Sequence, residues 1–81
     1  MARDQKLPFN LNDQLERAAS SIVLNLAEGS ARTSAKERKR FYVIAFASLR
    51  EVQALIDIED SLAHLKKVAD QLGASLYKLT H

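Results

Sequence analysis

Hydrophobic residues recur every three or four positions near the start of the chain, which is the spacing of one face of an α-helix. This stripe consists of Leu11, Leu15, Ala18, Ile22 and Leu26. Asn10 or Asn12 can cap the helix by accepting a hydrogen bond from a free backbone N–H. Gly29 is suited to the left-handed residue that follows many helices. We therefore predict a first helix over about residues 11–28, after a flexible lead over residues 1–9.

A second start signal follows at Ser34, where Ser-Ala-Lys-Glu fits a capping box: the Ser34 hydroxyl accepts the amide of Glu37, and the Glu37 side chain reaches back. From there hydrophobic residues continue in steps of three and four to Leu79, and residues 34–72 contain no Gly, Pro or Asn. This pattern predicts one long helix over about residues 35–79. The alternative is a break near residues 57–61, with Asp57, Asp60 or Ser61 capping a third helix.

Residues 41–47, FYVIAFA, are hydrophobic at every position. A helix that is hydrophobic all round is buried all round, and one short partner helix covers only one side. We therefore expect an all-α antiparallel helical hairpin that completes a four-helix-type bundle by oligomerisation. The residues assigned to the oligomer interface are Tyr42, Val43, Phe46, Ala47 and Ala54.

The composition narrows the class of protein. A chain of 81 residues is one domain, which we place at residues 10–81, and it gains from oligomerisation because so short a chain buries little surface alone. It has no cysteine, no hydrophobic run near the ~20 residues of a membrane span and no signal-peptide segment at its start. We expect a cytoplasmic protein with no membrane partner.

The basic residues are concentrated between the two predicted helices. Five of the twelve Lys and Arg residues are Arg32, Lys36, Arg38, Lys39 and Arg40, although the net charge is only +2. Cations in the first turns of a helix oppose its dipole, so stability does not explain their position. Helix N-termini also bind anions through free N–H groups, so these five residues form a candidate nucleic-acid-binding site. The alternative is a solvated helix end. No aromatic residue is clearly placed to stack on bases, so base-specific recognition is not expected.

Other polar residues are assigned a structural role. We expect a polar network across the corner between the helices, formed by Arg17, Asn25, Glu28, Ser34 and Glu37. No carboxylate is paired with a second acid, base or nucleophile, and the two histidines are far apart with no cysteine nearby. The sequence therefore predicts no catalytic residues, no metal site and no cofactor.

Several of these segments also match a family. LERAASSIVLNLAEG (residues 15–29) and IAFASLREV (residues 44–52), together with Arg32, Ser34 and Arg40, resemble the 23S rRNA intervening-sequence four-helix-bundle proteins. That group includes the accessory variability determinant of diversity-generating retroelements. Its members usually carry a further helix before the position of Phe9 and a glycine-containing loop before the last helix. We expect this chain to lack both features.

The resemblance implies a bacterial, non-enzymatic helical bundle that is often oligomeric. For the retroelement branch it implies a basic surface serving nucleic acid and a reverse transcriptase. Together with the residue patterns, it leads us to expect a homo-oligomeric accessory protein that binds RNA or DNA through the basic corner. The alternative function is a protein–protein interaction or scaffold module with no nucleic-acid role.

Overall fold

The computed structural model of the chain describes residues 10–81, and within that range it contains only helices, as the all-α prediction requires. They are α1 (Leu11–Ala31), α2 (Ala35–Ile58), the 3₁₀ helix η1 (Asp60–Leu65) and α3 (Lys66–Thr80). The flexible lead predicted for residues 1–9 lies outside the described residues.

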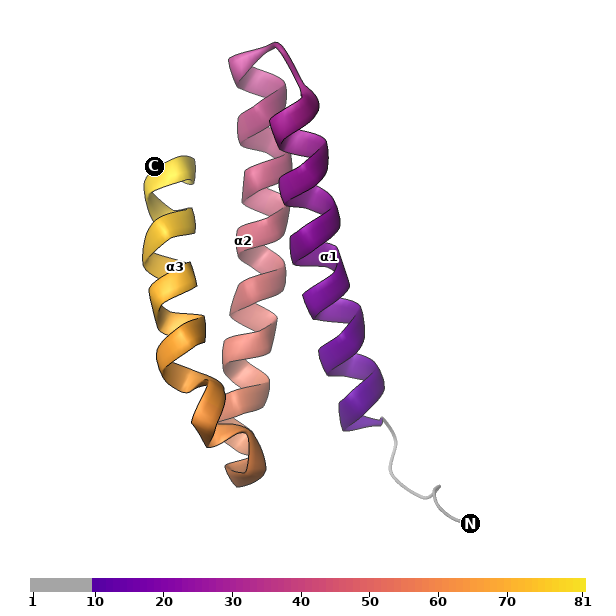
Figure 1. Cartoon of the computed structure of the whole chain (residues 1–81), viewed down its shortest axis with the longest axis vertical. Coiled ribbons are helices and arrows are strands. Elements are labelled where there is room, and N and C mark those ends of the chain that lie inside the picture. Colours follow the sequence, from indigo (N-terminus) through magenta and orange to yellow (C-terminus); the bar gives the residue numbers. More distant parts are fainter. Residues whose placement is uncertain (1–9) are drawn as a thin grey trace.

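The helices form a thin layer with α2 in the middle (Figure 1). Both α1 and α3 pack on α2, but no Cα atom of α1 comes within 8 Å of one in α3. The molecule measures 48 × 23 × 14 Å along its principal axes. Residues 10–81 therefore form three α-helices around an incompletely enclosed core, and these described residues do not close a four-helix bundle by themselves.

The first helix begins as predicted and ends later. Asn10 is the N-cap, with its Oδ1 accepting the amide of Asp13 at 3.2 Å, but α1 continues past residue 28 to Ala31. Gly29 is therefore a residue of the helix and not the left-handed residue that follows it. A Cβ atom on Gly29 would lie 2.7 Å from Cε1 of Tyr42, so the glycine allows α1 and α2 to approach each other closely.

The prediction of one continuous helix over residues 35–79 was wrong, and the break near residues 57–61 is present. Ser34 caps α2 as predicted, but α2 ends at Ile58 and Glu59 is extended, with φ −131° and ψ 108°. The backbone N–H of Leu62 then bonds to the carbonyl of Glu59, and η1 leads into α3. The chain reverses without any left-handed residue, so the absence of glycine did not prevent the turn.

The core runs along α2 between its two partner helices. Leu49 of α2 and Leu76 of α3 are the largest fully buried side chains. Further buried members of the core are Ala18, Ile22, Ala45, Val52, Ile56 and Ala69. No helix in the described part of the chain is long and hydrophobic enough to cross a membrane.

Candidate nucleic-acid interface

The corner between α1 and α2 carries the five predicted basic residues at one end of the molecule, at the top of Figure 1. Two of them make contacts that hold the corner together. Arg32 pairs with Glu28 at 3.0 Å between Nη2 and Oε2, and its guanidinium lies 4.9 Å from the centre of the Phe41 ring. Arg38 Nη1 donates to the backbone carbonyls of Arg32 and Thr33, at 3.2 and 3.0 Å.

The other three basic residues, Lys36, Lys39 and Arg40, form what we call the basic stripe. All three are exposed, and no carboxylate among residues 10–81 forms an ion pair with them. Successive residues of an α-helix are rotated by about 100°, and on this basis the three side chains lie within a sector of about 100° around the axis of α2. Ser48, whose hydroxyl bonds to Ser21 of α1, lies about 180° from Lys39 around the same helix. Lys39 therefore points away from this contact with α1, while Lys36 and Arg40 lie about 120° and 80° from Ser48 and are exposed to solvent.

The residues of the predicted polar network lie in separate local contacts. Asn25 Nδ2 donates to the carbonyl and hydroxyl oxygens of Ser21, at 2.8 and 3.1 Å, and the hydroxyls of Ser21 and Ser48 are 2.6 Å apart. Glu28 pairs with Arg32, while Ser34 accepts the amide of Glu37. Arg17 is exposed on α1, with no ion pair to the described carboxylates. The sequence analysis missed the Ser21–Ser48 contact, for which two serines on helix faces are only a weak signal.

The residues assigned to an oligomer interface differ in exposure. Val43 is 46% exposed, and Ala47 and Ala54 are also exposed. Tyr42 packs against Gly29 of α1, and the Phe46 ring meets Tyr77 of α3 edge-on, with ring centroids 6.3 Å apart. Because the chain turns back after Glu59, α3 of the same chain covers Phe46, which the sequence analysis had assigned to a contact with another subunit.

An aromatic cluster at the end of α3 was also missed. The rings of Tyr77 and His81 are stacked, with centroids 3.9 Å apart, and Arg50 lies 5.8 Å from the Phe46 ring centre. Tyr77 is 53% exposed, so at least one aromatic side chain is accessible, contrary to the sequence-based expectation. The spacing of Tyr77 and His81, four residues apart in a helix, was the available signal.

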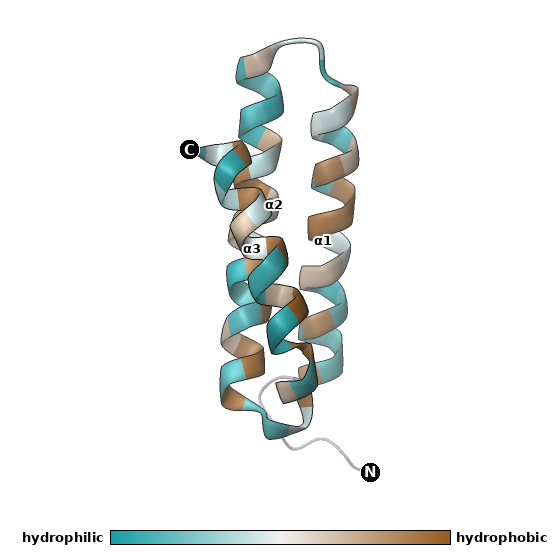
Figure 2. Ribbon diagram, turned by 60° about the vertical axis from the view of Figure 1, so that its left-hand side comes forward, coloured by the Kyte–Doolittle hydropathy of each residue, from teal (hydrophilic) through white to brown (hydrophobic). Residues whose placement is uncertain are grey.

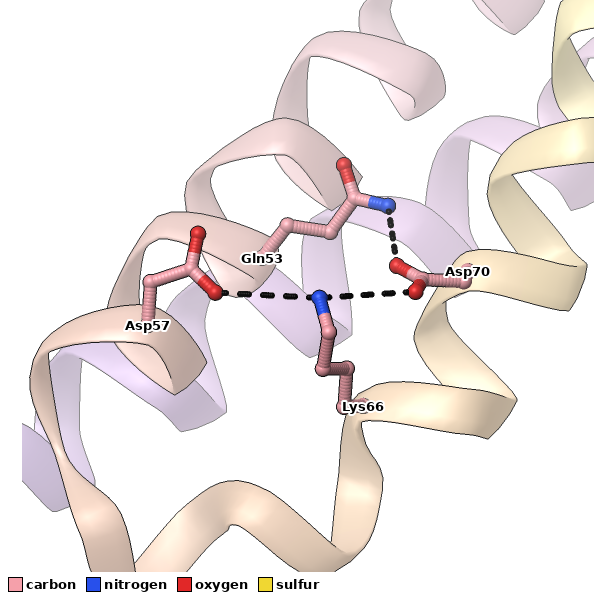
Figure 3. Close-up of polar contacts among 4 residues, drawn as sticks. All are labelled: Gln53, Asp57, Lys66 and Asp70. Atoms are coloured by element: carbon pink, nitrogen blue, oxygen red, sulfur yellow. Dashed lines mark hydrogen bonds and ion pairs between the residues drawn. The ribbon is translucent and has the colours of Figure 1, made fainter.

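The clearest cluster of charged side chains outside the corner joins α2 to α3. Lys66 Nζ lies 3.9 Å from a carboxylate oxygen of Asp57 and 3.5 Å from one of Asp70, and Gln53 Nε2 donates to Asp70 at 3.3 Å (Figure 3). All three charged side chains are more than half exposed, so each pair contributes little to stability, about 0–1 kcal/mol. Residues 10–81 contain no group of three or more His, Cys, Asp or Glu side chains that could hold a metal ion.

The comparisons with known proteins identify the family. No curated protein and no solved structure matches the chain significantly. The family model of the 23S rRNA-intervening sequence protein matches residues 3–80, a range that contains all the described helices and the basic corner. The resemblance noted in the sequence is thereby confirmed, and the chain belongs to the 23S rRNA-intervening sequence protein family.

Proposed function

We propose that this chain is a non-enzymatic, oligomeric helical-bundle protein that binds nucleic acid through phosphate contacts with Lys36, Lys39 and Arg40. The observation that carries the proposal is the exposed basic stripe in the first two turns of α2, which has no carboxylate partner among residues 10–81. Arg32 and Arg38 make contacts within the corner, so the three cations of the stripe are the ones available to bind a ligand.

The position of the stripe is electrostatically unfavourable for the folded chain. Each exposed cation near a helix N-terminus costs roughly 0.3–1 kcal/mol, because the dipole there is positive. Arg38 offsets this cost by donating to two carbonyl groups of the corner, whereas the described structure gives Lys36, Lys39 and Arg40 no comparable contact. Bound phosphates would remove the unfavourable interaction and would also accept from backbone N–H groups at the same helix end.

Contacts of this kind bind without reading sequence. Lys and Arg side chains on phosphates fix the position of a nucleic acid, but they distinguish one base from another only when they reach base edges. We therefore expect binding to single-stranded RNA and to duplex DNA of unrelated sequence, with strong dependence on salt because binding releases counterions.

The test compares two triple variants with the same loss of charge. Lys36→Ala, Lys39→Ala and Arg40→Ala together remove the stripe, whereas Arg17→Ala, Lys67→Ala and Lys78→Ala remove three exposed cations elsewhere. Fluorescence anisotropy with a labelled RNA oligonucleotide, at about 50–200 mM salt, should show at least about tenfold weaker binding only for the first variant. The slope of log K against log salt should shrink by about one for each lost contact.

Two results would count against this function. Equal weakening in both variants would mean that net charge, and not the stripe, controls binding. A parent protein that binds neither RNA nor DNA at low salt would favour the protein–protein interaction module instead. Circular dichroism of both variants serves as the folding control.

A further inference from the structure

Several large hydrophobic side chains remain exposed in residues 10–81, and three of those on the two outer helices lie on one side of the layer. Val23 of α1 is 65% exposed, while Val68 and Leu79 of α3 are 63% and 50% exposed. Hydrophobic positions recur along both α1 and α3 in Figure 2. The two helices have no Cα atoms within 8 Å of each other, so neither covers the other.

Hydrogen bonds show which way Val23 faces. The Ser21–Ser48 contact lies on one flank of the interface between α1 and α2. Val23 is about 160° and Leu26 about 140° from Ser21 around α1, so both lie on the other flank. On α2, Ser48 lies about 140° from Gln53, which donates to Asp70 of α3. The Ser48 flank is therefore turned away from α3, and the flank with Val23 and Leu26 is on the α3 side.

The corresponding contacts place Val68 on α3. Asp70 and Lys66, which meet Gln53 and Asp57, occupy one flank of the α2–α3 packing. Val68 is about 160° from Asp70 around the helix, on the other flank, and the exposed or partly buried Leu72 and Leu79 share its side. The hydrophobic flanks of α1 and α3 therefore open on the same side of the layer.

We propose that this surface, the α1–α3 face, is where a second copy of the chain docks. The face is defined by Val23, Leu26, Val68, Leu72 and Leu79. In the dimer, two copies bury the same face against each other about a two-fold axis, so that each copy covers the open side of the other's core. This inference rests on the oligomeric part of the proposed function and specifies its interface.

The size of the layer fits a stable dimer. A side of 48 × 23 Å offers on the order of 1,000 Å², against the roughly 800 Å² per partner of a standard interface. A second copy presents a face of the same length, so it can cover the whole side.

The chemistry of the face also favours an identical partner. Seen down the axis of α1, the sector of the helix surface between Leu15 and Val23 carries no charged residue from position 15 to position 30. On α3, the sector between Leu76 and Val68 carries no charged residue either. An uncharged hydrophobic surface offers nothing to pair with a charged partner or a phosphate backbone, whereas it is complementary to another copy of itself.

Adjacent residues of α1 provide a matched test. Val23 and Leu24 are 65% and 63% exposed, but Leu24 lies about 160° from Leu26 and so points away from the α1–α3 face. Sedimentation of the parent should give a species of about 18 kDa, twice the 9.1 kDa chain mass. Val23→Glu should shift it toward 9.1 kDa by raising the dimer dissociation constant at least tenfold, while Leu24→Glu should not.

A second measurement covers the case in which Val23→Glu fails to fold. The chain has no cysteine, so Val23→Cys and Leu24→Cys each introduce a single thiol. Maleimide should modify both at similar rates in dilute protein, and raising the protein concentration should slow only the reaction at position 23.

The outcomes separate the two proposals. A parent that is monomeric up to millimolar concentration would overturn this interface and the oligomeric part of the proposed function together, without affecting the nucleic-acid test. An oligomeric parent in which positions 23 and 24 behave alike, in either measurement, would overturn only the α1–α3 face.

Discussion

Residues that look equivalent in the sequence have different partners in the folded corner. Arg38 and Lys39 are adjacent cations in the first turns of α2, yet Arg38 donates to two backbone carbonyls while Lys39 is exposed on the basic stripe. The sequence analysis named all five basic residues but grouped them as one site. It had no means of dividing them, because the acceptors of Arg38 are carbonyl groups, which every residue carries.

This difference predicts opposite effects on stability. Arg38→Ala removes two hydrogen bonds at the corner and should lower the free energy of unfolding by about 1 kcal/mol, since each bond contributes roughly 0.5–1.5 kcal/mol and these are exposed. Lys39→Ala removes an unfavourable cation–dipole interaction and should leave stability unchanged or raise it by a few tenths to about 1 kcal/mol. Urea denaturation of the two variants measures both. Equal destabilisation would show that Lys39 also has a structural contact.

At the scale of elements, the ends marked by capping side chains were predictable. Asn10 and Ser34 begin α1 and α2 because their side-chain oxygens accept a helix amide. Ser34 was predicted from the sequence, which left Asn10 and Asn12 as alternatives for the first cap. The end of α2 was not, because Glu59 adopts an ordinary extended conformation that any residue can take. The hydrophobic register misled as well: Leu62, Leu65 and Leu72 pack on the core from η1 and α3, so they keep the spacing expected of one continuous helix.

The space around the two glycines shows how closely α2 approaches α1 at Gly29 and α3 at Gly73. A Cβ on Gly29 would lie 2.7 Å from the Tyr42 ring and 3.2 Å from Cβ of Phe41, which is attached directly to the α2 backbone and cannot move away easily. On Gly73 the nearest atom, at 3.1 Å, is Nε2 at the flexible end of Gln53. Alanine is favoured over glycine within a helix by roughly 1 kcal/mol at either position.

We therefore expect Gly29→Ala to be destabilising, because overpacking costs about 1–3 kcal/mol and exceeds the gain in helix propensity. Gly73→Ala should be neutral or stabilising by up to about 1 kcal/mol, since only the end of Gln53 has to move. Thermal melts followed by circular dichroism compare the two. A higher melting temperature for Gly29→Ala would mean that α1 and α2 can separate slightly without loss.

The whole molecule combines a buried core along α2 with an open side. Leu49 and Leu76 are almost fully buried, yet Val23 and Val68 in the outer helices are about two-thirds exposed. The sequence analysis predicted that one chain would not bury all its hydrophobic surface, and it assigned the excess to α2, where Val43 is 46% exposed. It could not locate the α1–α3 face because that depends on where α3 packs, and the position of α3 follows from the turn at Glu59.

If the α1–α3 face is buried between two copies, folding and association are linked. Ligands that bind only the folded state stabilise it by mass action, and a second copy acts as such a ligand, so the melting temperature of the parent should rise with protein concentration. Each tenfold rise in free partner above the dissociation constant adds about 1.4 kcal/mol. Val23→Glu should melt at a temperature independent of concentration, whereas Leu24→Glu should follow the parent. A parent whose melting temperature is the same from micromolar to millimolar concentration would show that the three-helix layer is stable alone, with its hydrophobic side open to solvent.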